Sequence, residues 1–449
     1  MNRVYKYFLL FVTLFAIVSC STAVEHEIAQ VASPVFLSST PASGASGVKP
    51  GNVTISITYD KNVFFASQKK DQLLISNGGS IVKADVIGSS PTLVVEVNCP
   101  SRNTSYTLTV PEGLVTGPNA MPAPAVEVSF TTQGLDMQPV NTLTPEAQKV
   151  YDFLQATYEQ KTISGMMANV SWNVEESDQV YAWTGKYPAL NCFDYIHLKA
   201  SAEGSWINYG DITPVSDWWN AGGLVAAMWH WNVPASEGSE SLTTYKDETA
   251  FDIDKAFTEG TWEYQTVQAD LEKIAGYLQL LKNEGIPVIW RPLHEAAGGW
   301  FWWGKNADSF KKLWIQMFDY FKAQGLNNLI WVWTTETGDA DWYPGDQYVD
   351  VVGRDLYGNS AADCASQYQT VISEFGNKMV ALSECGAYVD TQSPLGLLSE
   401  QWTAGARWLW FMPWYDNEGA SLSHADKAWW QDAMSQSYVI SRDQLPSFK

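Results

Sequence analysis

The chain has 449 residues, which is too long for one typical core and predicts two folded units plus a leader. Its 27 basic and 49 acidic residues give a formal net charge of −22. Such a field repels phosphate backbones, so nucleic acid is not an expected partner. The five Cys include no CxxC pair, which leaves a zinc site and a disulfide framework without support, and no metal or cofactor is expected.

Aromatic residues are abundant, with 22 Trp and 21 Tyr. Two interpretations are open: several Trp fill the core of a large domain, or a cleft stacks them against flat apolar surfaces such as the faces of sugar rings. Trp clusters beside polar residues at the ends of predicted strands favour the second.

Residues 1–19 have the pattern of an export signal, because Arg3 and Lys6 precede an apolar run over 8–18 that is too short to span a bilayer. The run closes as Ile-Val-Ser-Cys20, which resembles the lipobox of bacterial lipoproteins, where the Cys is diacylated. The resemblance implies a lipid-anchored protein of the bacterial cell envelope, exposed on the outer membrane, with residues 20–33 as a tether. The alternative is an ordinary signal peptide with a chance Cys.

Residues 34–133 predict a small all-β unit. Alternating runs with Gly, Pro, Asn or Ser between them suggest about seven short strands in about 100 residues, which is typical of an immunoglobulin-like sandwich. The segment resembles the bacterial Ig-like modules of secreted enzymes and carries no acid, base or exposed aromatic cluster, so a spacer is favoured over a sugar-binding module. Residues 134–143 are the predicted linker.

Residues 144–449 alternate apolar runs with amphipathic stretches. Thr144 and Pro145 have the character of a helix cap and a first helical residue, and further helices are predicted over 271–284 and 309–325. The eight runs cover 162–166, 189–193, 224–228, 287–290, 329–333, 349–352, 379–382 and 408–411. Eight βα repeats in about 300 residues predict a (β/α)8 TIM barrel.

The working residues of such a barrel lie at the carboxyl ends of its strands. Polar and aromatic residues gather there: His230 after the third run, His294 and Glu295 after the fourth, Asp355 and Tyr357 after the sixth, Glu384 after the seventh and Trp414 after the eighth. Strands four and seven face each other across the mouth. Two facing carboxylates in an aromatic cleft are the minimum equipment for glycoside hydrolysis. The alternatives are a salt bridge from Glu295 to Arg291 and a buried ion pair at Glu384.

The stretch Arg291-Pro-Leu-His-Glu295-Ala-Ala-Gly-Gly-Trp300-Phe-Trp-Trp-Gly304 closely resembles the acid/base signature of glycoside hydrolase family 26, which consists mostly of endo-β-1,4-mannanases. The resemblance covers roughly residues 144–440. It implies a retaining mechanism with Glu295 as acid/base and Glu384 as nucleophile. It further implies substrate-binding roles for His230, His294, Trp300, Asp355, Tyr357 and Trp414.

Three of these residues have a structural alternative to a binding role: His230 as a core histidine, Trp414 as part of the barrel packing, and Asp355 as an ion-pair partner of Arg354. Two positions depart from the family pattern, Ala296-Ala297 after the acid and Cys385 after the nucleophile. Residues 301–303 are either supporting wall or sugar contacts, and the polar stretch 234–257 is either a cleft wall or a solvated loop.

The leading hypothesis is a monomeric, lipid-anchored endo-β-1,4-mannanase acting on β-mannan, galactomannan or glucomannan. A second is hydrolysis of mixed-linkage β-1,3/1,4-glucan or β-xylan on the same fold. A third, of a different class, is a non-catalytic surface glycan-binding protein. Sugar release from a polysaccharide panel separates the three.

Overall fold

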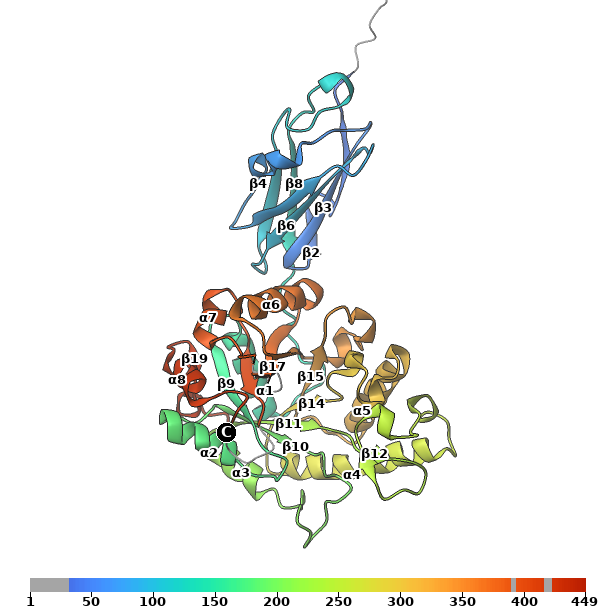
Figure 1. The fold of residues 1–449 in the computed structure, drawn as a ribbon, viewed down its shortest axis with the longest axis vertical. Coiled ribbons are helices and arrows are strands. Elements are labelled where there is room, and N and C mark those ends of the chain that lie inside the picture. Colours follow the sequence, from blue (N-terminus) through green and yellow to red (C-terminus); the bar gives the residue numbers. More distant parts are fainter. Residues whose placement is uncertain (1–31, 389–392, 416–421) are drawn as a thin grey trace, which may run out of the picture.

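A computed structural model describes residues 32–388, 393–415 and 422–449, which form a β-sandwich followed by a barrel (Figure 1). Cys20 and the predicted leader lie outside the described residues. In the part of the chain that the structure covers, no helix combines the length and apolar character that a membrane crossing requires.

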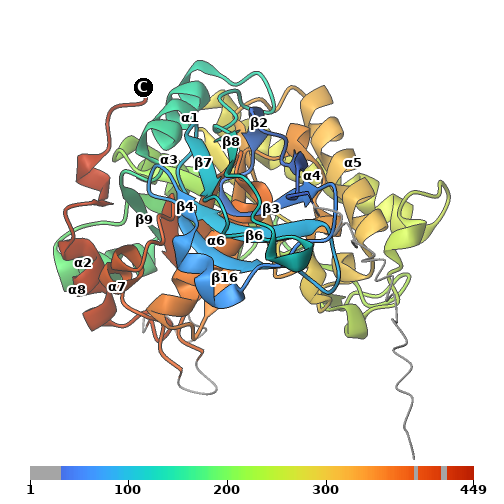
Figure 2. The same cartoon turned by 90° about the horizontal axis from the view of Figure 1, so that it is seen from above.

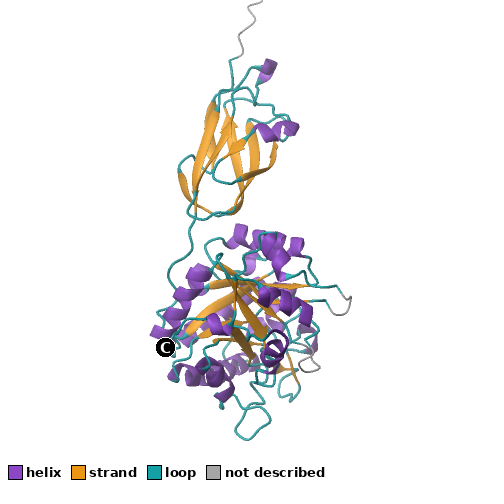
Figure 3. Cartoon of the chain, turned by 90° about the vertical axis from the view of Figure 1, so that its left-hand side faces the viewer, coloured by secondary structure: helices purple, strands orange, loops and turns teal. Residues whose placement is uncertain are grey.

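The sandwich consists of two four-stranded sheets (Figure 3). In the long central strand β3, alternate residues are buried, which is the pattern of a strand with one face on a core. The predicted all-β, Ig-like unit is confirmed, with eight strands where about seven were expected. One sheet has the order β1 (Phe36–Thr40), β3 (Gly51–Tyr59), β6 (Thr92–Cys99), β5 (Ser80–Asp85); the other has β2 (Ala45–Val48), β8 (Val126–Thr132), β7 (Ser105–Val110), β4 (Leu74–Ile75).

The second unit is a closed parallel barrel, because its first strand, β9, pairs with both β10 and β18. This confirms the predicted TIM barrel. The strands in order are β9 (Thr162–Met167), β10 (Leu190–Asp194), β11 (Leu224–Trp229), β14 (Val288–Pro292), β15 (Leu329–Thr335), β16 (Val351–Tyr357), β17 (Met379–Gly386) and β18 (Trp410–Pro413). Short strands accompany them: β12 (Val233–Pro234), β13 (Leu242–Thr243) and β19 (Val439–Ile440).

Helices surround the barrel and extend beyond the sandwich when the molecule is seen from above (Figure 2). Thr144 caps the first helix by accepting from the Ala147 N–H, and Pro145 is its first residue, as predicted. The helices are α1 (Pro145–Thr157), α2 (Glu175–Thr184), α3 (Thr213–Asn220), α4 (Trp262–Asn283), α5 (Ala307–Ala323), α6 (Ala361–Phe375), α7 (Leu398–Thr403) and α8 (Lys427–Ser435).

The barrel strands read as continuous apolar runs because both of their faces are covered. Trp290, Trp331, Trp333 and Trp410 are buried in these strands. Among the described residues, Trp206 and Trp300 are the only tryptophans with exposed side chains. The abundance of Trp is therefore explained mainly by core packing, and the cleft interpretation accounts for few of them.

The sandwich is docked on the barrel through Arg102. Its Nε donates to the Gly376 carbonyl at 2.9 Å, its Nη1 pairs with Glu159, and its guanidinium lies 5.0 Å from the centre of the Tyr158 ring. Within the linker, Asp136 accepts from Lys378 at 2.7 Å. All of these barrel residues lie between a helix and the start of the next strand, at the end of the barrel opposite to the mouth.

Candidate active site

Three carboxylates converge at the carboxyl ends of the barrel strands. Asp355 comes from β16, Glu384 from β17, and Glu295 from the loop after β14. One carboxylate oxygen of each lies within 4.8 Å of those of the other two. This closeness is compatible with a retaining pair, whose carboxyl groups lie about 5 to 5.5 Å apart, rather than with the roughly 6.5 to 9.5 Å of an inverting pair.

A bulge in β17 brings Glu384 beside Asp355. Arg354 pairs with Leu382 in the ladder and Asp355 pairs with Glu384, so Ser383 is the extra residue. The Ser383 hydroxyl donates to Asp355 Oδ1 at 2.8 Å. The bulge therefore both orients the predicted nucleophile and supplies a hydrogen bond to its neighbour.

Arg291 neutralises two of the three carboxylates. Its Nη1 donates to Glu384 Oε1 at 2.6 Å and its Nη2 pairs with Asp355, while its Nε donates to Thr334 Oγ1 at 2.8 Å. The alternative in which Arg291 simply bridges Glu295 is wrong, because the guanidinium is held by the other two carboxylates. The Arg354 pairing considered for Asp355 is wrong as well. The three carboxylates have the donor chemistry for a cation, but a guanidinium already fills that role.

Glu384 is further oriented by Tyr357 and His294. The Tyr357 hydroxyl donates to Oε2 at 2.8 Å, and His294 Nε2 lies 3.8 Å from Oε1. Burial, with the nearby Glu384 charge, raises the pKa of Tyr357, so its hydroxyl stays a donor. Burial lowers the pKa of His294, which keeps that ring neutral.

Glu295 has a different environment, because no arginine or lysine among the described residues forms an ion pair with it. Burial, followed by the charges of Asp355 and Glu384, raises the pKa of its carboxyl well above the ordinary range. Its side chain accepts from Trp300 Nε1 at 3.2 Å. Glu295 and Leu293 both adopt positive φ (+51°), a conformation that is uncommon for such residues and concentrates at functional sites.

The wall beside the carboxylates is built from His230, His294, Phe301 and Trp414. His230 has ring centres 4.4 Å from His294, 5.8 Å from Phe301 and 5.6 Å from Trp414. The structure thus brings every predicted site residue of the barrel to one mouth. Their binding roles stay predictions.

Asp194 was missed from the sequence. Its Oδ2 lies 2.5 Å from His230 Nδ1 and its Oδ1 accepts the His230 backbone N–H at 3.1 Å, with the carboxylate buried. The available signal was its place directly after the predicted run 189–193, where polar strand ends carry function. These two contacts with Asp194 fix the orientation of the His230 ring.

The aromatic residues 301–303, which follow Glu295, mainly support the neighbouring loops. Trp302 and Trp303 are buried, and their indole N–H groups donate to the carbonyls of Trp231 and His294. The stretch 234–257 lies against this run: Tyr245 forms a backbone bridge with Phe301 and stacks on its ring at 5.9 Å. This part of the stretch is therefore packed against the aromatic run rather than solvated on all sides.

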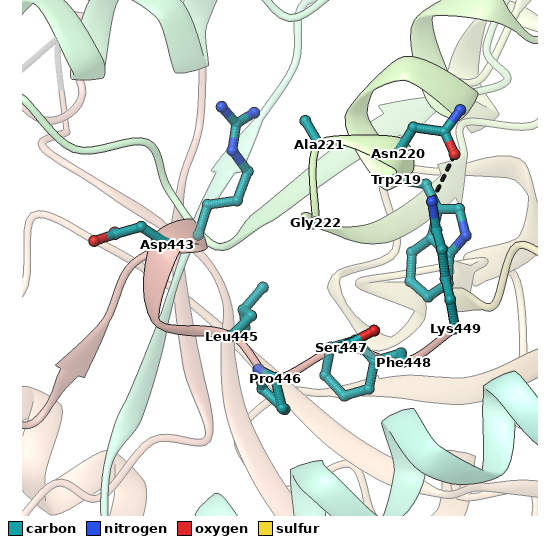
Figure 4. Close-up of a pocket in the computed structure, with 11 residues that line it drawn as sticks. Trp219, Asn220, Ala221, Gly222, Asp443, Leu445, Pro446, Ser447, Phe448 and Lys449 are labelled. Carbon is teal, nitrogen blue, oxygen red and sulfur yellow. Dashed lines mark hydrogen bonds between the residues drawn. The ribbon is translucent and has the colours of Figure 1, made fainter.

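A second hollow, of about 350 Å³, lies away from this chemistry (Figure 4). Trp219 stacks on Phe448 at 6.2 Å, and Lys449 donates to Asn220 at 2.7 Å. Its walls come from the end of α3 and residues 442–449, and the strand after α3 begins beside it. It is thus at the opposite end of the barrel from Glu295.

Comparison with protein families identifies this arrangement. The model of the glycosyl hydrolase family 26 matches residues 140–444, and that of a bacterial Ig-like domain matches residues 30–132. The chain belongs to glycoside hydrolase family 26. The predicted family and the accompanying Ig-like domain are confirmed.

Relatives with named activities support the same placement. The chain is 35% identical over 314 residues to mannan endo-1,4-β-mannosidase B of Piromyces sp., covering 68% of this chain and 52% of that protein. The chain thus spans about half the length of this relative and of the Piromyces A enzyme.

Two solved structures are similar to the barrel of this family 26 chain. The family 26 domain of an endo-β-mannanase/endo-β-glucanase from Prevotella bryantii is 39% identical, covers 69% of this chain and 99% of its own, and has a TM-score of 0.65. A β-mannanase from a symbiotic protist of the termite Reticulitermes speratus, complexed with a gluco-manno-oligosaccharide, is 36% identical, covers 70% and 98%, and has a TM-score of 0.61.

Proposed function

We propose that this family 26 chain is a retaining endo-β-1,4-mannanase that cleaves mannan-type polysaccharides. The observation that carries the proposal is the contrast between two neighbouring carboxyl groups. Glu295 has a raised pKa and forms no ion pair within the described part of the chain, whereas Glu384 is held by Arg291 and Tyr357. The mannanase names of the relatives support the choice of substrate.

In the first step Glu384 attacks the anomeric carbon and forms a glycosyl-enzyme ester, while the Glu295 proton moves to the glycosidic oxygen, whose bond to that carbon breaks. Arg291 and Tyr357 orient the attacking carboxylate. Trp300, bonded to Glu295, offers a flat apolar surface to the leaving sugar.

In the second step the Glu295 carboxylate takes a proton from water, and the resulting hydroxide equivalent attacks the anomeric carbon and releases Glu384. Two inversions at the same carbon give net retention. His230 and Trp414 border the sugar that is attached to the enzyme during this interval.

The deciding experiment is product analysis on linear mannan, galactomannan, lichenan and xylan, with proton NMR of the newly formed anomer. We expect mannan oligosaccharides of several lengths, appearing first as the β-anomer. Glu384→Ala should lose activity by a factor of about 10³ or more. Release of the α-anomer, or unchanged hydrolysis by Glu384→Ala, would refute the mechanism.

Glucan cleavage is a second candidate, since the Prevotella bryantii protein carries both mannanase and glucanase in its name. The lichenan arm of the same experiment tests it. Absence of sugar release from all four polysaccharides, together with retained binding, would instead favour the non-catalytic glycan-binding hypothesis.

We also propose that the enzyme is a monomer held on the outer face of a bacterial envelope by acyl chains on Cys20. The leader pattern and the lipobox-like Ile-Val-Ser-Cys20 support this. Radiolabelled palmitate should enter the wild-type chain and not Cys20→Ala in a bacterial host. Light scattering of the chain that starts at residue 32 should give one protomer's mass.

A further inference from the structure

Trp206 is an exposed aromatic residue at the mouth of the barrel with no role in the mechanism above. Its side chain is 68% exposed, compared with 43% for Trp300. It lies in the loop between β10 and α3, on the same end of the barrel as Glu295. A flat apolar ring at the mouth of a polysaccharide-cleaving barrel is suited to stack on the apolar face of a sugar.

The loop that holds Trp206 is fixed by hydrogen bonds. Ser201 Oγ accepts the Tyr209 N–H at 2.8 Å, and the Ser201 carbonyl accepts from Lys273 Nζ on α4 at 3.0 Å. Close to the indole, the Ala202 N–H donates to the Ile207 carbonyl at 3.3 Å. A ligand that stacks on Trp206 therefore has little loop entropy to overcome.

Contacts connect Trp206 to the wall of the catalytic pocket. Its ring centre lies 4.7 Å from that of His197, in an edge-on arrangement. Three residues before His197, Asp194 binds His230, and Asn232 donates to the carbonyl of the residue before His197 at 2.7 Å. Trp206 therefore lies beyond His230, whereas Trp300 lies beside Glu295, the acid that protonates the leaving sugar.

We propose that Trp206 and the edge of His197 form an outer subsite for one sugar unit of a β-1,4-mannan chain, on the non-reducing side of the cleaved bond. The proposal rests on the proposed function. The Trp206 indole stacks on the sugar, and burial lowers the pKa of His197, so its neutral ring can exchange hydrogen bonds with a hydroxyl. Long chains that reach both exposed indoles are bound on both sides of the cleavage point.

The test compares Trp206→Ala, Trp206→Phe and the wild type on mannooligosaccharides of three to six units whose reducing ends carry ¹⁸O. We expect Trp206→Ala to lower kcat/KM on the longest substrate by roughly three- to tenfold, the range for one aromatic contact, and to leave the shortest unchanged. Mass spectrometry should show cleavage shifted towards the non-reducing end. Trp206→Phe, which keeps an aromatic ring, should retain most of the wild-type kcat/KM on the longest substrate and most of the wild-type cleavage pattern.

Phe64→Ala is the matched control, because it removes an exposed aromatic ring, 57% accessible, from the sandwich. It should leave the profile of chain lengths unchanged. If Trp206→Ala lowers kcat/KM by the same factor on oligosaccharides of every length, or leaves kcat/KM unchanged on all of them, the outer subsite is refuted. If the wild type does not cleave these oligosaccharides at all, the proposed function itself fails, which is a distinct result.

Discussion

At the scale of single residues, the environment separates the roles of two identical carboxyl groups. Glu384 accepts hydrogen bonds from Arg291 and Tyr357, which hold its carboxylate in one orientation. Glu295 is largely buried and lies near the negative charges of Asp355 and Glu384, and both effects favour its neutral form. This contrast is the one that the proposed roles of nucleophile for Glu384 and acid for Glu295 require.

The raised pKa of Glu295 predicts the alkaline side of the pH profile. A group with a raised pKa keeps its proton through neutral pH and loses it as the pH rises through that value, so kcat/KM should fall there. Glu295→Gln should abolish this limb and lower activity on mannan by about 10² to 10⁴. An aryl mannoside with a dinitrophenolate leaving group, which needs no proton, should still react with Glu384 in the variant. Persistence of the same limb in Glu295→Gln would contradict the assignment.

Asp194 is predicted to be a positioning residue that acts through His230. Asp194→Asn keeps the shape but removes the negative charge beside Nδ1, so we expect kcat/KM to fall about 10-fold or more, with a shifted pH profile. Asp178→Asn is the control, since that carboxylate accepts from Tyr187 at the surface. A loss of thermal stability with unchanged pH dependence would indicate a merely structural role.

At the scale of elements, β16 and β17 approach closely where the site is built. A Cβ added at Gly353 would lie 2.3 Å from the hydroxyl of Ser383, the bulge residue that donates to Asp355. Gly353→Ala should therefore lower the free energy of unfolding by about 1–3 kcal/mol and reduce kcat/KM as Asp355 shifts.

Gly276→Ala provides the control for that substitution. Gly276 lies inside α4, and a Cβ added there would meet open space, so alanine should leave activity unchanged and stabilise the helix by about 1 kcal/mol. Both variants are measured by urea unfolding and by mannan hydrolysis. Equal stability of Gly353→Ala and wild type would show that the two strands tolerate the added methyl group.

The same elements show which features are visible in a sequence. The barrel could be predicted because strands that are buried on both faces consist of continuous apolar runs. Glu295 and Glu384 could be identified because they are polar residues at the ends of such runs. The partners of Arg291 could not be predicted, because they depend on a one-residue bulge at Ser383 that has no local sequence pattern. Likewise, the pairing of Asp194 with His230 depends on the spacing of two neighbouring strands.

At the scale of the whole molecule, Arg102 is, among the described residues of the sandwich, the one with the most polar and ring contacts to the barrel. Arg102→Ala removes the hydrogen bond to Gly376, the pair with Glu159 and the stacking on Tyr158. We expect the full chain to lose about 1–3 kcal/mol of stability and the linker 134–143 to be cleaved faster by protease. Lys83→Ala, an exposed cation of the sandwich, should change neither. Unchanged proteolysis of Arg102→Ala would show that the remaining contacts, such as that of Lys49 Nζ with the Glu374 carbonyl and those of the linker, suffice to hold the two units together.

The docked sandwich also determines where the enzyme can work. The described part of the chain begins at the far end of the sandwich from the barrel, because the Ala32 carbonyl accepts from Lys61 beyond the end of β3, whereas Gly51 at the start of β3 lies against Ser373 of α6. Arg102 and Asp136 fix the barrel to the near end of the sandwich. On the proposed acylation of Cys20, this geometry turns the barrel mouth, which lies at the end opposite to the sandwich, away from the anchored end of the chain. We therefore expect glycan chains that extend outward to be the ones presented for cleavage.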